Sequence, residues 1–210
     1  MIGIPLLVAA LCCAAPATAE QEALWLRYPA ISPDGSTLVF TYRGDLYRVP
    51  ASGGVATQLT THPAHDFMPV WSRDGRHIAF ASDRHGNFDV FVMPAEGGEA
   101  RRLTVHSVDE YPYAFSADGE GVIYGAARLD AAENRLFPSA AQPELYQVPV
   151  TGGRPRQLLT TPAEEVAVSS DGRLMVYEDR KGQENAWRKH HTSSVARDLW
   201  VYDVASGTHR

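Results

Sequence analysis

Apolar and polar positions along the chain follow a recurring order, in which short apolar runs are separated by turn residues. Four such runs are rich in β-branched and aromatic residues and nearly continuous in apolar character: residues 37–42, 77–82, 121–126 and 173–178. This composition is typical of strands that are covered on both faces. No segment shows a sustained helical period, so the pattern predicts an all-β protein.

A second strand is predicted after each of these runs, at residues 45–50, 89–94, 144–149 and 198–203. Each opens with an acid, and three end in Pro, which cannot continue a hydrogen-bonded ladder. The acids are Asp45, Asp89, Glu144 and Asp198. A catalytic acid is needed once, whereas these recur, so we interpret them as hydrogen-bonding groups of turns and strand starts.

Three short landmarks recur in the same order along the chain. Ser-x-Asp-Gly begins at Ser32, Ser72, Ser116 and Ser169, Gly-Gly at Gly53, Gly97 and Gly152, and Leu-Thr at Leu59, Leu103 and Leu159. Asp-Gly between two apolar runs is a strong hairpin signal, because Asp accepts a backbone N–H and Gly adopts positive φ. The landmarks define a repeat of roughly 40–45 residues, the length of a propeller blade.

The repeat predicts a β-propeller of four-stranded antiparallel blades. The blades span approximately residues 28–60, 68–104, 111–160 and 165–210, so that three are complete and most of a fourth is present. A β-sandwich also contains many short strands, but it does not repeat its turns in register. A single blade cannot bury both of its faces, so blades are stable only when they stack around an axis.

The first 19 of the 210 residues are apolar and carry no charged side chain. They end in Ala17-Thr18-Ala19, a small-x-small cleavage pattern, and we interpret them as a secretory signal peptide cleaved after Ala19. An uncleaved N-terminal anchor is the alternative. The expected location is therefore the periplasm or the exterior. Both cysteines lie in this segment, so residues 20–210 can form neither a disulfide nor a thiolate metal site.

Two insertions interrupt the repeat, at residues 127–143 and 179–197. Both leave their blade between its second and third strands, so both are expected on the same rim. The second is basic and offers candidate contacts for acidic peptides or carboxylate groups. The candidates are Trp187, Arg188, Lys189, His190 and His191. The alternatives are a solvated loop held by Trp187, or a loop that docks a neighbouring domain.

The sequence predicts no catalytic, cofactor or metal site. His62 and His65 are three residues apart across a proline, which is not a zinc-ligand spacing on a helix. His190, His191 and Ser193 lie too close in sequence to form a nucleophile and its oriented base, and no Gly-x-Ser-x-Gly elbow occurs. The pair Arg101-Arg102 is expected to be solvated charge on an edge strand. The net charge of −6 without a basic stripe argues against nucleic-acid binding.

The sequences ISPDGSTLVFTYRGDLYRVPASGG and WSRDGRHIAFASDRHGNFDVFVMPAEGGEARRLT resemble blades of the TolB-like and tricorn-protease propellers. The loop YEDRKGQENAWRKHHTSSVARDLWVYD is similar to the bacterial tricorn-like proteins. The resemblance implies the N-terminal propeller of a serine peptidase, forming part of a six-bladed ring. A second propeller, a PDZ module and a catalytic core would follow. The family's catalytic Ser and His would lie beyond residue 210, so none is assigned here.

The resemblance implies a non-catalytic region that gates or channels peptides or unfolded protein segments toward a downstream proteolytic core. Its partners would be the downstream domains and, in a homo-oligomer, further copies of the chain. Two alternatives stay open: a TolB-like periplasmic scaffold that binds proteins, and the propeller of a prolyl-oligopeptidase-like enzyme. Export departs from the archetypal tricorn protease, which is intracellular, and therefore puts a cytosolic role in doubt.

Residues 20–210 expressed alone are expected to be aggregation-prone, because the last predicted blade exposes an unpaired edge and an apolar face. Analytical ultracentrifugation and thermal unfolding test this expectation. A monomer with one sharp, cooperative unfolding transition would contradict it.

Overall fold

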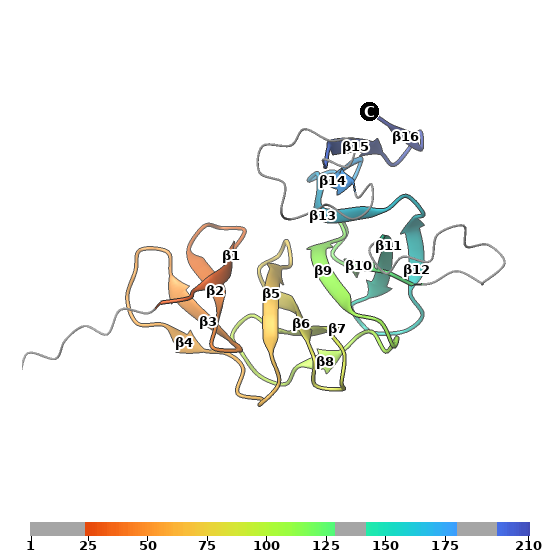
Figure 1. The fold of residues 1–210 in the computed structure, drawn as a ribbon. Helices are drawn as coiled ribbons and strands as arrows, with labels where there is room; N and C mark the ends of the chain where they lie inside the picture. Colours follow the sequence, from red (N-terminus) through yellow and green to blue (C-terminus); the bar gives the residue numbers. More distant parts are fainter. Residues whose placement is uncertain (1–23, 129–141, 180–196) are drawn as a thin grey trace, which may run out of the picture.

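The computed structural model describes residues 24–128, 142–179 and 197–210, and the strands in these ranges form four separate antiparallel sheets of four strands (Figure 1). The first sheet contains β1 (Arg27–Ile31), β2 (Thr37–Tyr42), β3 (Asp45–Pro50) and β4 (Thr57–Gln58). The second contains β5 (Asp66–Trp71), β6 (His77–Ser82), β7 (Asp89–Pro94) and β8 (Arg101–Arg102). The third contains β9 (Glu110–Phe115), β10 (Gly121–Ala126), β11 (Glu144–Pro149) and β12 (Arg156–Leu159). The fourth contains β13 (Ala163–Val168), β14 (Leu174–Asp179), β15 (Leu199–Asp203) and β16 (Thr208–His209).

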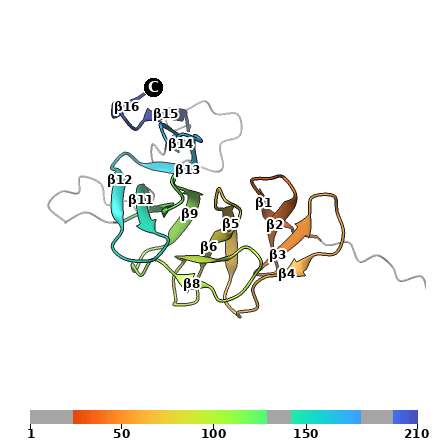
Figure 2. The same cartoon turned by 180° about the vertical axis from the view of Figure 1, so that it is seen from behind.

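The four sheets are propeller blades that follow one another along an arc, and the view from behind shows the same order (Figures 1 and 2). The first strands of the blades, β1, β5, β9 and β13, lie innermost and contact one another in sequence. The last strands, β4, β8, β12 and β16, lie at the outer edge. The predicted all-β propeller is thus confirmed. The fourth blade has all four of its strands, because β16 pairs with β15 after the turn at Gly207.

Each Ser-x-Asp-Gly landmark is a self-contained turn between the first and second strands of a blade. In blade 3, the hydroxyl of Ser116 donates to Asp118 Oδ1 at 2.5 Å, and Ser116 Oγ accepts the N–H of Gly121 at 2.9 Å. Gly119 closes the turn at φ +75°, a conformation that favours glycine. The serine hydroxyl and the backbone N–H of Glu120 lower the pKa of Asp118. Equivalent bonds begin at Ser32, Ser72 and Ser169.

In blades 1 and 2, the Leu-Thr landmark links the end of the outer strand to the third strand of the same blade. Thr60 Oγ1 accepts the N–H of Leu46 at 3.0 Å, and Thr104 Oγ1 accepts the N–H of Val90 at 2.9 Å. The threonine hydroxyl thus replaces a ladder bond where the short outer strand has ended. The chain after a two-residue outer strand therefore stays bonded to the third strand.

The hydrophobic core lies between blades. On β6, Ile78 and Phe80 pack with Val39 and Leu46 of blade 1, whereas Ala79 packs against blade 3. Successive residues of a strand point to opposite faces, so one strand serves two interfaces. A third cluster joins blades 3 and 4. Strands β6 and β10 are almost fully buried, because in the described structure blades 2 and 3 have a neighbour on each side.

One side chain connects blades that are not neighbours. Arg73, in the Ser-x-Asp-Gly turn of blade 2, donates from Nη2 to the carbonyl oxygens of Val168 at 3.0 Å and Ser169 at 2.6 Å. Both carbonyls belong to blade 4, which blade 3 separates from blade 2 along the arc. In blade 3, the residue equivalent to Arg73 is Ala117, which is too short to make such a bond.

Replacing Ser116 by Ala should lower the free energy of unfolding by about 1–2 kcal/mol, because the buried N–H of Gly121 loses its acceptor. Urea unfolding of the full chain, followed by circular dichroism, measures this change. The control Ser107→Ala lies in an exposed linker and should stay within about 0.5 kcal/mol of wild type. Equal effects of the two substitutions would contradict the role assigned to the turn.

Candidate functional site

The two rims of the propeller have different architectures. The Ser-x-Asp-Gly and Gly-Gly turns form one rim, here called the turn rim. The connections between second and third strands and the linkers between blades form the other, here called the loop rim. In the described ranges the loop rim includes residues 43–44, 59–65, 83–88, 103–109 and 160–162. Both insertions begin and end at the loop rim, as the sequence predicts.

Backbone hydrogen bonds at the loop rim connect the starts of β5, β9 and β13 to the preceding blade. The N–H of Asp66 donates to the carbonyl of Gly44 at 2.7 Å, and the N–H of Glu110 donates to that of Phe88 at 2.8 Å. Ala163 makes the same bond to Pro143 at 2.9 Å. These bonds fix the side chains at the inner-strand starts relative to the neighbouring blade.

Two buried ion pairs recur at the loop rim in blades 2 and 3. Arg84 Nη2 lies 2.7 Å from Asp66 Oδ2, and Arg128 Nη2 lies 2.6 Å from Glu110 Oε1. Both carboxylates are fully buried. In each pair the arginine follows the acid by 18 residues. These pairs were not predicted from the sequence, although the equal separation of acid and arginine in two adjacent repeats is a detectable signal.

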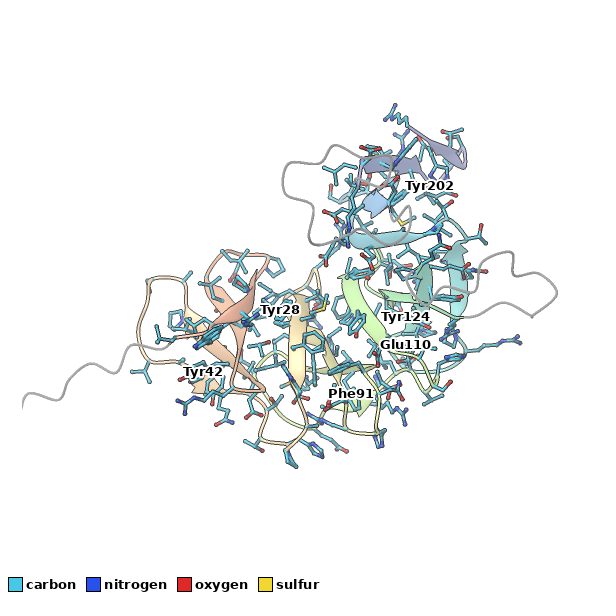
Figure 3. The ribbon with its side chains drawn as sticks, viewed as in Figure 1. Tyr28, Tyr42, Phe91, Glu110, Tyr124 and Tyr202 are labelled. Carbon is cyan, nitrogen blue, oxygen red and sulfur yellow. The ribbon has the colours of Figure 1, made fainter. Side chains whose placement is uncertain are left out.

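Each of these arginines also covers an aromatic pair on the second and third strands. The guanidinium of Arg128 lies 5.7 Å from the ring of Tyr124 and 4.4 Å from that of Tyr146. Arg84 lies over Phe80 and Phe91 in the same manner. Figure 3 shows Glu110 and Tyr124 close to one another in blade 3, and Arg128 donates to both side chains. Because Arg84 and Arg128 are each paired with a buried carboxylate and packed on aromatic rings, we interpret these charges as structural groups of the rim.

Asp89 and Arg102 correct two expectations from the sequence. Arg102 is not simply solvated, because its Nη2 lies 2.7 Å from Oδ2 of the fully buried Asp89. Asp89 therefore forms an ion pair, whereas Asp45 and Glu144 accept side-chain hydrogen bonds as expected. Burial raises the pKa of Asp89 to about 6. The nearby charge of Arg102 lowers this pKa, and that of Glu110 raises it further.

A row of aromatic side chains crosses the inner strands at the loop rim. Tyr28, Phe67 and Tyr111 are each the second residue of an inner strand, in three successive blades. Ring centroids are 5.3 Å apart between Tyr28 and Phe67, and 5.8 Å apart between Phe67 and Tyr111. Phe88 and His65 extend this aromatic row, with their rings 4.8 and 5.2 Å from that of Phe67.

The backbone beneath the aromatic row is irregular. Inner strands β1, β5 and β13 each shift register near their start, and β9 shifts opposite Ile123 and Tyr124. Tyr28, Met68 and Glu165 have φ values of 51°, 53° and 50°, which are uncommon for residues other than glycine. Bulges of this kind redirect side chains and occur at the rims of closed sheets.

Two pockets open on the loop rim. A pocket of about 870 Å³ lies on blade 1, lined by Trp25, Tyr42, Arg43 and the linker that carries His62 and His65. A smaller one of about 240 Å³ lies beside the aromatic row. Its lining includes Asp109, Tyr111, Tyr113, Gly125 and Glu164.

The packing of Tyr113 in the wall of the smaller pocket requires glycine at position 125. A Cβ atom there would lie 2.6 Å from the ring and hydroxyl of Tyr113, which covers this point of β10. The close approach of Tyr113 to the strand thus depends on the absence of a side chain at residue 125.

The sequence-predicted contact residues Trp187, Arg188, Lys189, His190 and His191 lie outside the described residues. His62 and His65 are exposed in the linker before β5. His62 Nδ1 accepts the N–H of Ala64, and the ring of His65 joins the aromatic row. In the described ranges no group of three His, Cys, Asp or Glu side chains is arranged to hold a metal ion. No helix there has the length and hydropathy of a membrane span.

These observations define the chain as a β-propeller region whose inner strands meet at an aromatic and acidic rim. The protein-family model of the tricorn protease N-terminal beta propeller domain matches residues 23–210. The chain therefore belongs to that family. No curated protein sequence matches the chain significantly.

Solved structures show the same fold at low sequence identity. A TolB structure from Agrobacterium tumefaciens has a TM-score of 0.68 and 21% identity over 89% of this chain and 61% of its own. The tricorn protease has a TM-score of 0.66 and 14% identity over 91% of this chain and 23% of its own. A puromycin-hydrolyzing peptidase of Mycobacterium tuberculosis has a TM-score of 0.58 and 15% identity, over 90% and 29%. The chain thus spans less than two thirds of each of these structures.

Replacing Asp89 by Asn should change how stability depends on pH. The folded pKa of about 6 lies above the ordinary value of 3.8, so Asp89 stabilises the fold most when protonated. Its contribution is present below about pH 4 and is lost as the pH rises to about 6. Between pH 4 and pH 7, the free energy of unfolding of wild type should fall relative to that of D89N by up to about 3 kcal/mol. Urea unfolding at the two pH values measures this change. Parallel pH profiles of the two proteins would contradict the assignment.

Proposed function

We propose that this chain is the non-catalytic propeller region of an exported tricorn-like serine peptidase, in which it gates or channels peptides toward a proteolytic core. The observation that carries the proposal is the match of residues 23–210 to the tricorn N-terminal propeller. Export rests on the signal-like character of residues 1–19. The proposed partners are peptides or unfolded protein segments, the downstream domains of the same protein and, in a homo-oligomer, further copies of it.

The geometry of the inner strands supports a role in handling peptides. The four inner strands lie along the inner side of the arc. The starts of β1, β5 and β9 present the aromatic row at one rim. Aromatic groups at a channel mouth contact apolar side chains of an extended chain without requiring one sequence.

The recurring hydroxyls support a non-catalytic role. Ser32, Ser72, Ser116 and Ser169 each donate to the aspartate of their own turn. Each hydroxyl is also the acceptor for a backbone N–H five residues on. The base beside each hydroxyl is an aspartate whose pKa is lowered by the hydrogen bonds it accepts, which makes it a weak base for activating a nucleophile.

A TolB-like scaffold that binds proteins in the periplasm is the second candidate. It is favoured by the TolB fold, which this chain matches with a TM-score of 0.68. The propeller of a prolyl-oligopeptidase-like enzyme is a third. The reading frame after Arg210 discriminates among them: a PDZ-like stretch and a downstream serine favour the tricorn-like peptidase, and an end soon after six blades favours the scaffold.

The 210-residue chain should bind unfolded peptides but should not hydrolyse them. Fluorogenic peptides measure turnover, and fluorescence anisotropy of labelled peptides measures binding. Turnover that exceeds the background and copurifies with the chain would overturn the non-catalytic role. Absence of binding to every peptide would overturn peptide handling, and binding only to a folded protein partner would favour the scaffold.

A further inference from the structure

We infer that the aromatic row and the acidic pocket beside it select peptide segments in which an aromatic side chain is adjacent to a lysine or arginine. This inference rests on the proposed function and names the substrate class of the same rim. It differs from the acidic ligand that the sequence predicts for residues 187–191.

The aromatic row is accessible, unlike the aromatic residues of the core. Tyr124 and Phe80 are fully buried between blades, whereas Tyr28 is 45% exposed and Phe67, Phe88 and Tyr111 are partly exposed. Figure 3 shows Tyr28 on β1, directed toward β5. Edge-to-face contacts hold the rings at fixed positions, so an incoming aromatic side chain meets a preformed surface.

The backbone conformation beneath the aromatic row is unfavourable on its own. Tyr28 and Met68 have positive φ, which costs of order 1 kcal/mol or more at a residue with a side chain. Such conformations persist where the surrounding structure enforces them, and they cluster at ligand-contacting sites. Here the bulges place successive aromatic side chains on one rim rather than within the grooves between blades.

Carboxylates lie at the blade 3 end of the aromatic row. The hydroxyl of Tyr111 donates to Asp109 Oδ2 at 3.3 Å, and the N–H of Phe88 donates to Asp109 Oδ1 at 3.0 Å. Asp109 is exposed, and among the described residues no basic side chain lies within 4 Å of it. It therefore adds negative potential beside the ring of Tyr111. Burial raises the pKa of Tyr111 to about 12, with a contribution from Asp109, and the tyrosine therefore stays neutral.

The acidic pocket beside the aromatic row extends this negative potential toward blade 4. Its volume of about 240 Å³ lies below the ~300 Å³ at which small-molecule sites begin, and it is therefore suited to a single side chain. Asp109 and Glu164 both line it. Arg197 pairs with Glu164 and Glu178, so the cation is expected to enter beside Asp109. A lysine or arginine entering here gains both carboxylate and ring contacts.

Charge complementarity and the aromatic surface together identify the occupant. A Phe-Lys or Tyr-Arg segment can place its ring on the aromatic row and its cation beside Asp109. An acidic segment would place like charges together, and nucleic acid would do so along its whole backbone.

Fluorescence anisotropy with the full chain tests the inference, using three labelled, unstructured peptides of equal length. Their central dipeptides are Phe-Lys, Ala-Lys and Phe-Glu. The Phe-Lys peptide should bind about tenfold more tightly than either of the others, a difference of about 1.4 kcal/mol. The preference for Lys over Glu should weaken at high salt, because surface charge pairs are screened.

Variants locate the two parts of the site. Asp109→Asn should reduce the preference for Lys over Glu about threefold or more and leave the preference for Phe over Ala in place. Tyr28→Ala should weaken both Phe peptides and leave the Ala-Lys peptide unchanged. Tyr202→Ala, an aromatic residue of β15 near the turn rim, is the matched control and should leave all three affinities unchanged (Figure 3). Circular dichroism verifies that each variant is folded.

The outcomes separate this inference from the proposed function. Equal binding of the three peptides, or tightest binding of the Phe-Glu peptide, would overturn the inference while peptide handling stands. Wild-type selectivity retained in both Asp109→Asn and Tyr28→Ala would overturn the location of the site. No binding of any peptide would overturn both proposals.

Discussion

Burial of both faces of every blade is the constraint on which this structure depends. A four-stranded sheet with apolar residues on both sides gains little stability until each face meets another sheet. The alternation along β6 meets this requirement, because Ile78 and Phe80 pack toward blade 1 while Ala79 packs toward blade 3. The blades are therefore not independent units, and the core is a series of interfaces rather than a single centre.

The polar architecture of the two rims follows from this packing. Strands that are buried to their ends carry their terminal polar groups into the interior, where each needs a partner. At the turn rim the partners are local, since Ser116 and Asp118 bond within one turn. At the loop rim they are distant in sequence, and charge is added: Asp66 meets Arg84, and Glu110 meets Arg128. The loop rim is consequently the part where a substitution affects two strands and one inter-blade junction together.

The local chemistry of the turns explains why the fold could be predicted from the sequence. The Ser-x-Asp-Gly turn depends on residues within six positions, so its recurrence is visible without coordinates. The aromatic row was not predictable in the same way. Tyr28, Phe67 and Tyr111 come together only because successive inner strands are adjacent. Tyr28 also precedes its landmark serine by four residues, whereas the other two precede theirs by five. Arg102 was misjudged because its edge strand looks exposed, although the carboxylate of Asp89 is buried beneath it. The rim contacts proposed at residues 187–191 remain predictions.

Arg73 gives the arc a mechanical property that pairwise packing alone does not provide. Its guanidinium donates to two carbonyl groups of blade 4. Arg73 therefore links blade 2 directly to blade 4, with blade 3 packed between these two blades. Hinging at either of the two intervening grooves would stretch the same pair of bonds. Blades 2, 3 and 4 should therefore move as one rigid body. Bending should concentrate at the groove between blades 1 and 2, which the hydrogen bonds of Arg73 do not span.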